Sequence, residues 1–192
     1  DLVQGSLRCT DDSLGLHGEI LGCRDCGMAF NRDLPSPGEL AARYREIEDP
    51  VYLEQEASRE IMFQRHLEQL HSFVVPPGRL LDVGCYTGVF LQLATAAGWN
   101  AVGSELSGWA ARIARGRGFA IEEAAIEDLP FSAGEFSAVT LWDVLEHLAD
   151  PVGAMNCVNR MLQPGGWLGF STYLLDSAAA KLLGKRYPFL MD

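Results

Sequence analysis

The sequence predicts an α/β fold in which helices cover both faces of a mostly parallel sheet. From residue 79 onward, short apolar runs typical of buried strands alternate with segments of helical periodicity. The first of these runs ends in an acid and passes at once into a glycine-rich turn, "LLDVGCYTG" at residues 80–88. Strands and helices that alternate in this way are joined by right-handed crossovers. The expected architecture is therefore a doubly wound, Rossmann-like sheet that binds its ligand at the carboxyl ends of the strands.

The expected elements follow one another in order along the chain. Strands are predicted at "RLLDVG", "WNAVGSEL", "FAIEEA", "EFSAVTLWDV" and "GWLGFSTY", of which the third is the weakest. Helices are predicted at "GVFLQLATAAG", "GWAARIARGRG" and "PVGAMNCVNRML". Glycine readily ends a helix in the left-handed conformation, so we expect Gly98 to close the first of these helices and Gly116 or Gly118 the second.

Composition divides the chain into three segments. Residues 1–31 are rich in Gly, Asp and Cys and show no helical period. Residues 36–75 are expected to be helical and to act as a linker or lid, and residues 76–192 carry the main domain. The main domain ends soon after its fifth strand, which would leave that strand as an exposed edge that isolated proteins avoid. We therefore expect a continuing chain, or a second chain as in a dimer, to cover this edge.

Two helices are predicted in the segment 36–75. The first opens with Ser36 as N-cap, Pro37 at the first helical position and Glu39 as the capping-box partner. The second is expected over residues 51–74, with one apolar face packed on the main domain, and "VPPGR" ends it. The residues expected on that face are Leu53, Ala57, Ile61, Leu67, Leu70 and Val74.

Composition also excludes several classes of function. The net charge is −11, with 15 Lys and Arg against 26 acids, so the chain is unsuited to the phosphates of a nucleic acid. No run approaches the roughly 20 apolar residues of a membrane span, and the first residues do not show the basic and apolar pattern of a signal sequence. The five cysteines, an odd number, fit reduced thiols. We expect a soluble, cytoplasmic protein with one main core and a small-molecule partner, and neither a nucleic acid nor a membrane partner.

The glycine turn excludes two common cofactor motifs. A dinucleotide-binding G-x-G-x-x-G that begins at Gly84 would need glycine at positions 86 and 89, which hold Tyr86 and Val89. A P-loop is excluded because no Gly-Lys-Ser/Thr follows. The turn instead reads D-x-G-x-Y-x-G, from Asp82 through Gly84 to Gly88. Such a turn suits a ligand that is not a diphosphate.

In this order the motifs resemble those of the class I S-adenosylmethionine (SAM) dependent methyltransferases, over roughly residues 75–175. The resemblance implies that Glu105, 21 residues after Gly84, binds the ribose hydroxyls of SAM. In "AIEDLPFSAGEFSA", Ala125 stands where an Asp often meets the adenine amino group, so that contact is assigned to Glu127 or to the backbone of Ile126. The segments "LWDVLEHLADP" and "MLQPGGWLGFST" are also close to the family pattern. The implied cofactor-binding residues are Asp82, Gly84, Tyr86, Gly88, Glu105, Leu106, Ile126, Glu127, Trp142 and Asp143.

Tyr86 replaces the commonest residue of the first motif. Its ring either stacks on the methionine end of SAM or points outward. An aromatic face favours a cationic sulfonium, so we expect contact with the cofactor.

The candidate catalytic residues follow the fourth strand. Methyl transfer to a hydroxyl requires an aligned nucleophile and a group that accepts a proton. In "WDVLEHL", His147 is the candidate general base because its pKa is ordinarily near neutral, and Glu146 lies beside it. Two alternatives remain open. His147 braces the loop without chemistry, or Asp143, Glu146 and His147 together bind a divalent ion such as Mg²⁺ or Mn²⁺.

The N-terminal cysteines resemble part of a zinc ribbon. Cys23-x-x-Cys26 followed by glycine has the form of one zinc knuckle, with Cys9 as the third ligand. Some SAM methyltransferases of sugar, polysaccharide and lipid pathways are similar, with "C-x-x-C-G-x-x-F…P-S-x-x-E-L…Y" before the methyltransferase domain. Where the fourth cysteine is expected, Asp12 stands instead, with His17 nearby. Either Asp12 or His17 completes a zinc site, or the segment is a metal-free remnant.

These inferences predict a SAM-dependent methyltransferase that acts on an oxygen or carbon of a small molecule such as a sugar, a polyketide or a quinone-like compound. The sheet is expected to lack the last two strands of the family fold. The alternative is a non-catalytic module that binds SAM or a partner.

Overall fold

The computed structural model describes residues 20–25, 27–32, 35–174, 177–178 and 182. These residues belong to two compact units. The smaller unit combines residues 1–36 with 173–192, and the larger unit is formed by residues 37–172. In the described part of the smaller unit, strands β1 (Ile20–Gly22) and β2 (Ala29–Asn31) form an antiparallel hairpin. Its turn is closed by Cys23, whose N–H donates to the Met28 carbonyl at 2.8 Å.

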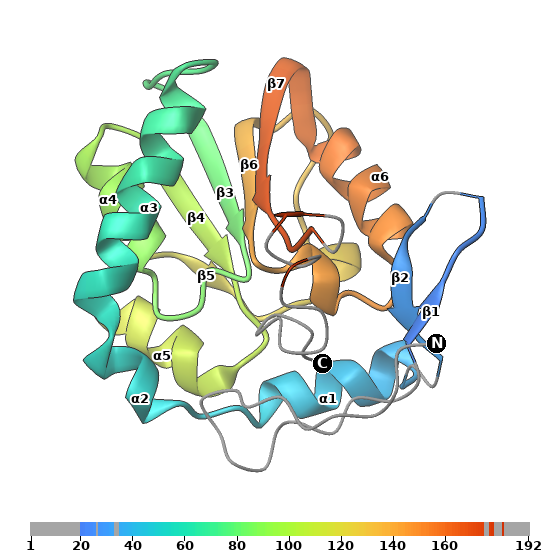
Figure 1. The fold of residues 1–192 in the computed structure, drawn as a ribbon. Helices are drawn as coiled ribbons and strands as arrows, with labels where there is room; N and C mark the ends of the chain where they lie inside the picture. Colours follow the sequence, from blue (N-terminus) through green and yellow to red (C-terminus); the bar gives the residue numbers. More distant parts are fainter. Residues whose placement is uncertain (1–19, 26, 33–34, 175–176, 179–181, 183–192) are drawn as a thin grey trace. The chain divides into compact units, whose positions relative to one another are not determined.

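The described part of the larger unit contains a sheet of five parallel strands (Figure 1). They are β3 (Arg79–Val83), β4 (Asn100–Ser104), β5 (Ile121–Glu122), β6 (Phe136–Trp142) and β7 (Leu162–Ser171). Their order across the sheet is β5-β4-β3-β6-β7, and each neighbouring pair is parallel. The chain runs outward from β3 to β5 and then returns to the other side of β3. The doubly wound prediction is confirmed, and the switch point lies between β3 and β6.

Helices occupy the predicted crossovers. They are α4 (Val89–Ala96), α5 (Gly108–Gly116) and α6 (Pro151–Met161). After α4, Gly98 has φ +101°, and after α5 the left-handed residue is Gly118, with φ +94°, rather than Gly116. Of the two alternatives for the end of α5, Gly118 is therefore correct. Two short 3₁₀ turns, η1 (Ile126–Asp128) and η2 (Leu145–His147), follow β5 and β6.

The core lies on both faces of the sheet because successive strand residues point to opposite sides. Leu80 packs with Phe90 of α4 in one cluster, whereas its neighbour Leu81 packs with Val158 of α6 in another. Figure 1 shows the corresponding layers, with α3 and α4 beside one face and α6 beside the other. Cys157 packs against the cluster that contains Leu81, and Cys85 belongs to a third cluster, with Leu91 and Ala111.

The residues before β3 form three helices, which we call the cap segment (residues 37–71). They are α1 (Pro37–Arg45), α2 (Pro50–Glu54) and α3 (Glu56–His71). The helix predicted over residues 51–74 is therefore interrupted at Gln55, whose φ of −99° and ψ of 3° leave the helical region. Figure 1 shows α1 and α2 at the carboxyl ends of the strands, whereas α3 runs along the sheet.

The predicted apolar face of this helix was partly wrong. Phe63, Leu67 and Leu70 are its buried residues, whereas Ile61 is 61% exposed, and Leu53 and Ala57 are also exposed. Spacings of four and three residues place the buried side chains in one stripe, and Ile61 lies on the opposite side of the helix. The break at Gln55 also separates Leu53 from that stripe.

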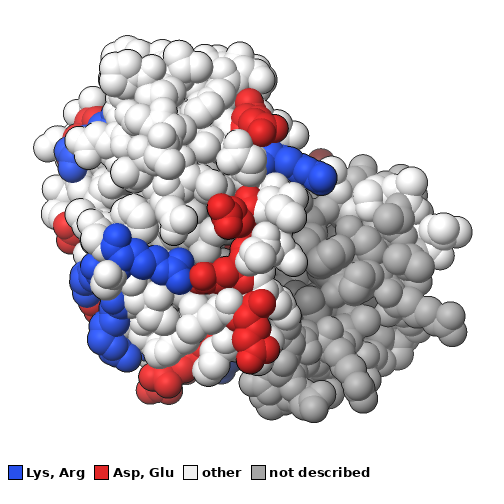
Figure 2. Space-filling view, turned by 90° about the vertical axis from the view of Figure 1, so that its left-hand side faces the viewer, with Lys and Arg blue, Asp and Glu red and all other residues white. Residues whose placement is uncertain are grey.

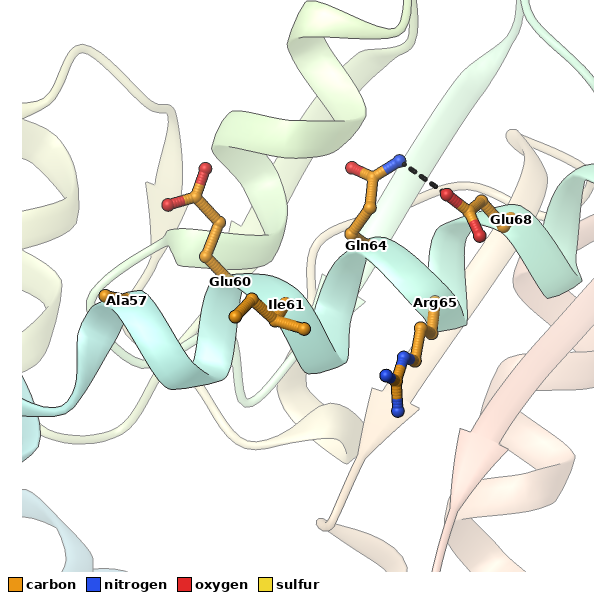
Figure 3. A pocket seen from close by; sticks show the side chains of 6 residues that line it. All are labelled: Ala57, Glu60, Ile61, Gln64, Arg65 and Glu68. Carbon is orange, nitrogen blue, oxygen red and sulfur yellow. Dashed lines mark hydrogen bonds between the residues drawn. The ribbon is translucent and has the colours of Figure 1, made fainter.

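The outer side of α3 faces solvent. A depression of about 390 Å³ lies along it, and Figure 3 shows the side chains that line it. Its lining residues are Ala57, Glu60, Ile61, Gln64, Arg65 and Glu68. In the space-filling view of Figure 2, acidic and basic side chains lie next to one another in several places, and no large area of a single charge is seen. No helix among the described residues combines the length and the apolar character needed to cross a membrane.

Two truncations on α3 test the corrected face. Leu67→Ala should lower the free energy of unfolding by about 2–5 kcal/mol, because Leu67 is only 3% exposed and its removal leaves a cavity. Ile61→Ala should change it by less than about 0.5 kcal/mol, because this side chain already contacts water. Urea denaturation of both variants measures the two values, and equal losses would show that the face is assigned incorrectly.

Candidate cofactor and catalytic site

The glycine turn joins β3 to α4 at the switch point. The N–H groups of Gly84 and Cys85 both donate to the Ser104 carbonyl at the end of β4, at 2.8 and 3.0 Å. Gly84 has φ +68°, and a Cβ atom there would lie 2.6 Å from Val144 Cγ2. Gly88 has φ +84° and caps α4, with Phe119 3.0 Å from the position of a Cβ atom. Both positions therefore require glycine. Gly88 is buried, whereas Gly84 is exposed and leaves its backbone open to the close approach of a ligand.

Tyr86 adopts a left-handed conformation that non-glycine residues rarely take, with φ +48°. Its backbone N–H donates to Glu105 Oε2 at 2.9 Å. Its ring lies 4.3 Å from that of Tyr52 on α2 and 5.9 Å from that of Trp109 on α5. The turn is thus held by an acid from the next strand, and its aromatic side chain faces the cap segment.

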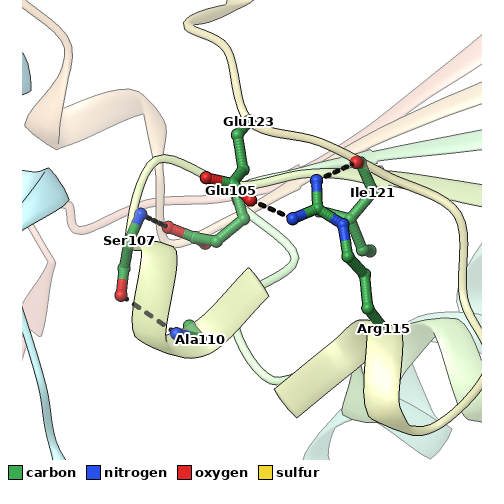
Figure 4. A network of polar contacts seen from close by, with 6 residues as sticks. All are labelled: Glu105, Ser107, Ala110, Arg115, Ile121 and Glu123. Carbon is green, nitrogen blue, oxygen red and sulfur yellow. Dashed lines mark hydrogen bonds and ion pairs between the residues drawn. The ribbon is translucent and has the colours of Figure 1, made fainter. Parts of the chain in front are cut away.

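Glu105 is buried where β4 ends, with 8% of its surface exposed (Figure 4). Oε1 accepts the Ser107 N–H at 2.7 Å, and the Leu106 N–H is also bonded to the carboxyl group. Burial raises the pKa of Glu105, and hydrogen bonds from the backbone of Ser107, Tyr86 and Leu106 oppose this rise. Each carboxylate oxygen has more than one lone pair, so the group can still accept hydrogen bonds from a ligand.

The same loop begins helix α5. Ser107 Oγ accepts the Ala110 N–H at 3.1 Å as the N-cap, and it donates to the Ile47 carbonyl of the cap segment at 2.7 Å. Arg115 pairs with Glu123 and donates to the Ile121 carbonyl at 2.6 Å, which holds the end of β5 against α5 (Figure 4).

Asp82 lies beside this site at the end of β3, with 2% of its surface exposed. Its Oδ1 accepts the Thr140 hydroxyl at 2.7 Å. Burial raises the pKa of Asp82 to about 7; the Thr140 hydrogen bond lowers it and the negative charge of Glu105 adds to the rise. Two buried acids at one edge favour a ligand that carries positive charge.

The two residues predicted to contact the adenine differ in their burial. The Ile126 side chain is buried in the core cluster on the α6 face, whereas Glu127 is exposed. Trp142 stacks on His66 of α3, with ring centroids 4.5 Å apart and planes 10° from parallel. The Nε1 atom of Trp142 is buried and has no hydrogen-bond partner in the described structure.

The candidate catalytic residues lie after β6. Asp143 has φ +54°; its N–H donates to Ser171 Oγ at 2.9 Å, and its Oδ1 accepts the Ser171 hydroxyl at 2.7 Å. Burial lowers the pKa of His147 and Asp143 opposes this effect, so the imidazole is neutral over a wider pH range. The Glu146 side chain is exposed. Desolvation and the negative charge of Asp143 raise the pKa of its carboxyl group, and a hydrogen bond with Thr172 lowers it.

The divalent-metal alternative is not supported by this arrangement. In the described ranges, no group of three or more His, Cys, Asp and Glu side chains is placed to hold an ion, and this includes Asp143, Glu146 and His147. Leu145–His147 form a single 3₁₀ turn, and the Asp143 carboxylate accepts the hydroxyl of Ser171. For the zinc prediction, Cys23 lies at the hairpin turn, whereas Cys9, Asp12, His17 and Cys26 fall outside the described residues.

Sequence reasoning missed three residues that the cap segment brings to this edge. Tyr44 of α1 lies edge-on to His147, with ring centroids 6.1 Å apart; burial and the charges of Glu146 and Glu105 raise its pKa to about 12. Arg59 of α3 places its guanidinium 3.8 Å from the centre of the Tyr52 ring, and its Nε is buried with no partner among the described residues. Tyr44 is the last residue of the motif that resembles the zinc-ribbon methyltransferases, but nothing in that motif gave it a role in the site. Tyr52 and Arg59 carried no signal beyond their residue types.

Comparison with known proteins defines the class. A family model described as a methyltransferase domain matches residues 54–192, so the chain belongs to this methyltransferase family. The ubiquinone biosynthesis O-methyltransferase of Thiobacillus denitrificans is 33% identical over 124 residues, which cover 57% of this chain and 53% of that protein. The chain spans about half the length of the curated relatives that it matches.

Solved structures agree with the observed fold. A SAM-dependent methyltransferase of Thermotoga maritima, described as a possible histamine N-methyltransferase, superposes with a TM-score of 0.59 at 22% identity, covering 77% of this chain and 67% of that one. The [4+2]-cyclase SpnF is 28% identical with a TM-score of 0.53, covering 58% and 43% of the two chains. The first likeness supports the fold alone. The second shows that a related fold is also found in a protein named for a different reaction.

The buried Asp82 predicts a pH dependence of stability. Its pKa in the folded protein, about 7, is above the ordinary value of 3.8, so the folded state holds an extra proton between these values. Stability from this group therefore falls as the pH rises from about 4 to about 7. Asp82→Asn cannot titrate and still accepts the Thr140 hydroxyl, so its free energy of unfolding should fall less over this range. Urea denaturation at several pH values tests this, and parallel pH profiles of variant and parent would contradict it.

Proposed function

We propose that this domain binds SAM at the carboxyl ends of the strands and transfers its methyl group to an oxygen of a small-molecule acceptor. The observation that carries the proposal is the Glu105 carboxylate, buried beside a turn that has no room for side chains at Gly84 and Gly88. A buried carboxylate with spare lone pairs suits the two hydroxyls of a ribose. The names of the curated relatives favour oxygen over carbon as the methylated atom and a quinone-like acceptor over a sugar or a polyketide.

The remaining cofactor contacts follow from the same edge. The sulfonium would lie near the Tyr86 and Tyr52 rings, where Asp82 and Glu105 supply negative charge. The buried Nε of Arg59 would gain a partner in the carboxylate of the cofactor's methionine end. The adenine would meet the backbone of Ile126 or the exposed Glu127, with Leu106, Asp143 and Trp142 nearby, as the family resemblance implies.

His147 is the residue that we assign to proton transfer. Burial lowers its pKa, so the imidazole is neutral at near-neutral pH and can accept the proton of an acceptor hydroxyl. Glu146 lies next to it at the open side of the site. Since SAM supplies an activated methyl group, the protein has to align the hydroxyl, remove its proton and exclude water.

Calorimetry with SAM, S-adenosylhomocysteine (SAH) and NAD tests the cofactor assignment. Binding of SAM and SAH without NAD supports the proposal, and binding of NAD alone contradicts it. If SAM binds but no methyl group reaches any acceptor in a panel of phenols and catechols, the non-catalytic module becomes the better description, as the likeness to a cyclase allows.

Glu105→Ala should weaken SAM binding at least tenfold. The change removes hydrogen bonds to a charged group, each worth about 1.5–3 kcal/mol. Calorimetry measures the dissociation constant, and Glu60→Ala on the outer side of α3 is the control because Glu60 is exposed. An unchanged dissociation constant in Glu105→Ala would remove this residue from the site.

His147→Ala should slow methyl transfer by about 10²- to 10⁴-fold, because the acceptor hydroxyl loses its base. The SAM dissociation constant should stay within about twofold of the parent value, since the imidazole is assigned to the acceptor. Transfer of a labelled methyl group to the phenols and catechols of the same panel gives the rate. Equal rates in parent and variant would leave His147 with a bracing role alone.

We further propose that the N-terminal segment holds zinc through Cys9, Cys23 and Cys26, with Asp12 or His17 as fourth ligand. The support is the knuckle spacing and the position of Cys23 at the turn of a hairpin. Elemental analysis of chelator-free protein should find about one zinc per chain, which Cys23→Ser and Cys26→Ser lose. A zinc content near zero in the parent protein would mean that the segment is a metal-free remnant.

The exposed edge of the sheet is the place where we propose that further chain or a second copy adds. Among the described strands β7 pairs with β6 alone, and Trp167 and Phe170 on it are 41% and 48% exposed. Unpaired edges that expose apolar side chains favour association.

A further inference from the structure

Glu56 lies in the first turn of α3 and joins two other elements. Its Oε1 accepts the Thr87 hydroxyl at 3.0 Å and an N–H of Arg117 at 2.7 Å. Thr87 belongs to the glycine turn and is completely buried, and Arg117 is the C-cap residue that follows α5. The carboxylate therefore ties the cap segment to the glycine turn and to the end of α5.

The glycine turn needs such an anchor. Tyr86 and Gly88, on either side of Thr87, both have positive φ, and this conformation is unfavourable for tyrosine. Unfavourable backbone conformations persist only where the surroundings fix them. On one side the Tyr86 N–H is held by Glu105, and on the other the Thr87 hydroxyl is held by Glu56. The first anchor belongs to the main sheet and the second to the cap segment.

The opposite end of α3 is attached to the main sheet independently. There the buried Trp99 donates from Nε1 to His71 Nε2 at 3.0 Å. The two ends of α3 thus have separate polar attachments. Glu56 at its start is bonded to the glycine turn, and His71 at its end is bonded to Trp99. This separation allows a role in cofactor binding to be distinguished from a general role in stability.

We propose that Glu56 is a positioning residue that fixes the glycine turn in its ligand-binding shape, so that cofactor affinity depends on the docking of the cap segment. The role rests on the proposed SAM site. Arg117 orients the carboxylate, because a charged pair holds one oxygen toward Thr87. The turn itself carries the backbone that approaches the cofactor, so a loosened turn binds the cofactor less well without the loss of any direct contact.

Three variants test the role with SAH as the ligand. Thr87→Val keeps the shape of the side chain and removes its hydroxyl, and Glu56→Ala removes the acceptor; each should weaken SAH binding about tenfold by calorimetry. Glu56→Gln keeps an oxygen for Thr87 and should recover most of the affinity. The double variant Thr87→Val with Glu56→Ala should be no weaker than either single variant, because both remove the same hydrogen bond.

His71→Ala is the matched control. It breaks the other attachment of α3, so it should lower the melting temperature while SAH affinity stays within about twofold of the parent. If Glu56→Ala and His71→Ala weaken SAH binding equally, or if Glu56→Ala leaves it unchanged, the positioning role is overturned.

Hydrogen exchange of the free protein separates this inference from the cofactor assignment. The amides of residues 84–88 should exchange faster in Glu56→Ala and Thr87→Val than in the parent or in His71→Ala. If the parent binds no SAH but these amides respond as expected, the cofactor assignment fails and the anchoring of the turn stands. If the parent binds SAH and the amides do not respond, the inference about Glu56 fails.

Discussion

The arrangement of the loops at the carboxyl ends of the strands depends on one buried group, the Glu105 carboxylate. Its two oxygens accept N–H groups from two separate loops, Tyr86 in the glycine turn and Ser107 at the start of α5. A buried carboxylate without such partners would be strongly unfavourable, so the acid and the two loops stabilise one another. The left-handed conformation of Tyr86 and the N-cap of α5 both follow from this arrangement. The same geometry leaves a charged acceptor at the place where the strands end.

The parallel sheet determines which side chains meet there. The strand β3 lies between β4 and β6, and all three are parallel. Their carboxyl ends therefore bring together Asp82, Glu105 and the residues after Trp142. The cap segment adds Tyr44, Tyr52 and Arg59 from outside the sheet. Acids from the sheet and aromatic rings from the cap suit a cationic, partly apolar cofactor.

Sequence periodicity predicted the strands, their order along the chain and the glycine requirement at Gly84 and Gly88, because these depend on local backbone conformation and on alternating burial. It did not place the cap segment, since an amphipathic helix indicates which side is buried but not what it packs against. The misassigned Ile61 shows this limit. The buried side of α3 begins at Phe63, and it could be identified only from the structure, in which Phe63 packs against Phe90. The contacts of Glu56 and Tyr44 join residues far apart in sequence, so no spacing rule could predict them.

A crystal structure of the protein with SAH tests the central claim most directly, because it shows what the Glu105 carboxylate binds. The account predicts that both ribose hydroxyls donate to this carboxylate while the N–H groups of Tyr86 and Ser107 stay bonded to it. The glycine turn should keep the conformation seen here, with the Tyr86 and Tyr52 rings near the sulfur. A nucleoside bound elsewhere, with Glu105 bonded only to its backbone partners, would contradict the account.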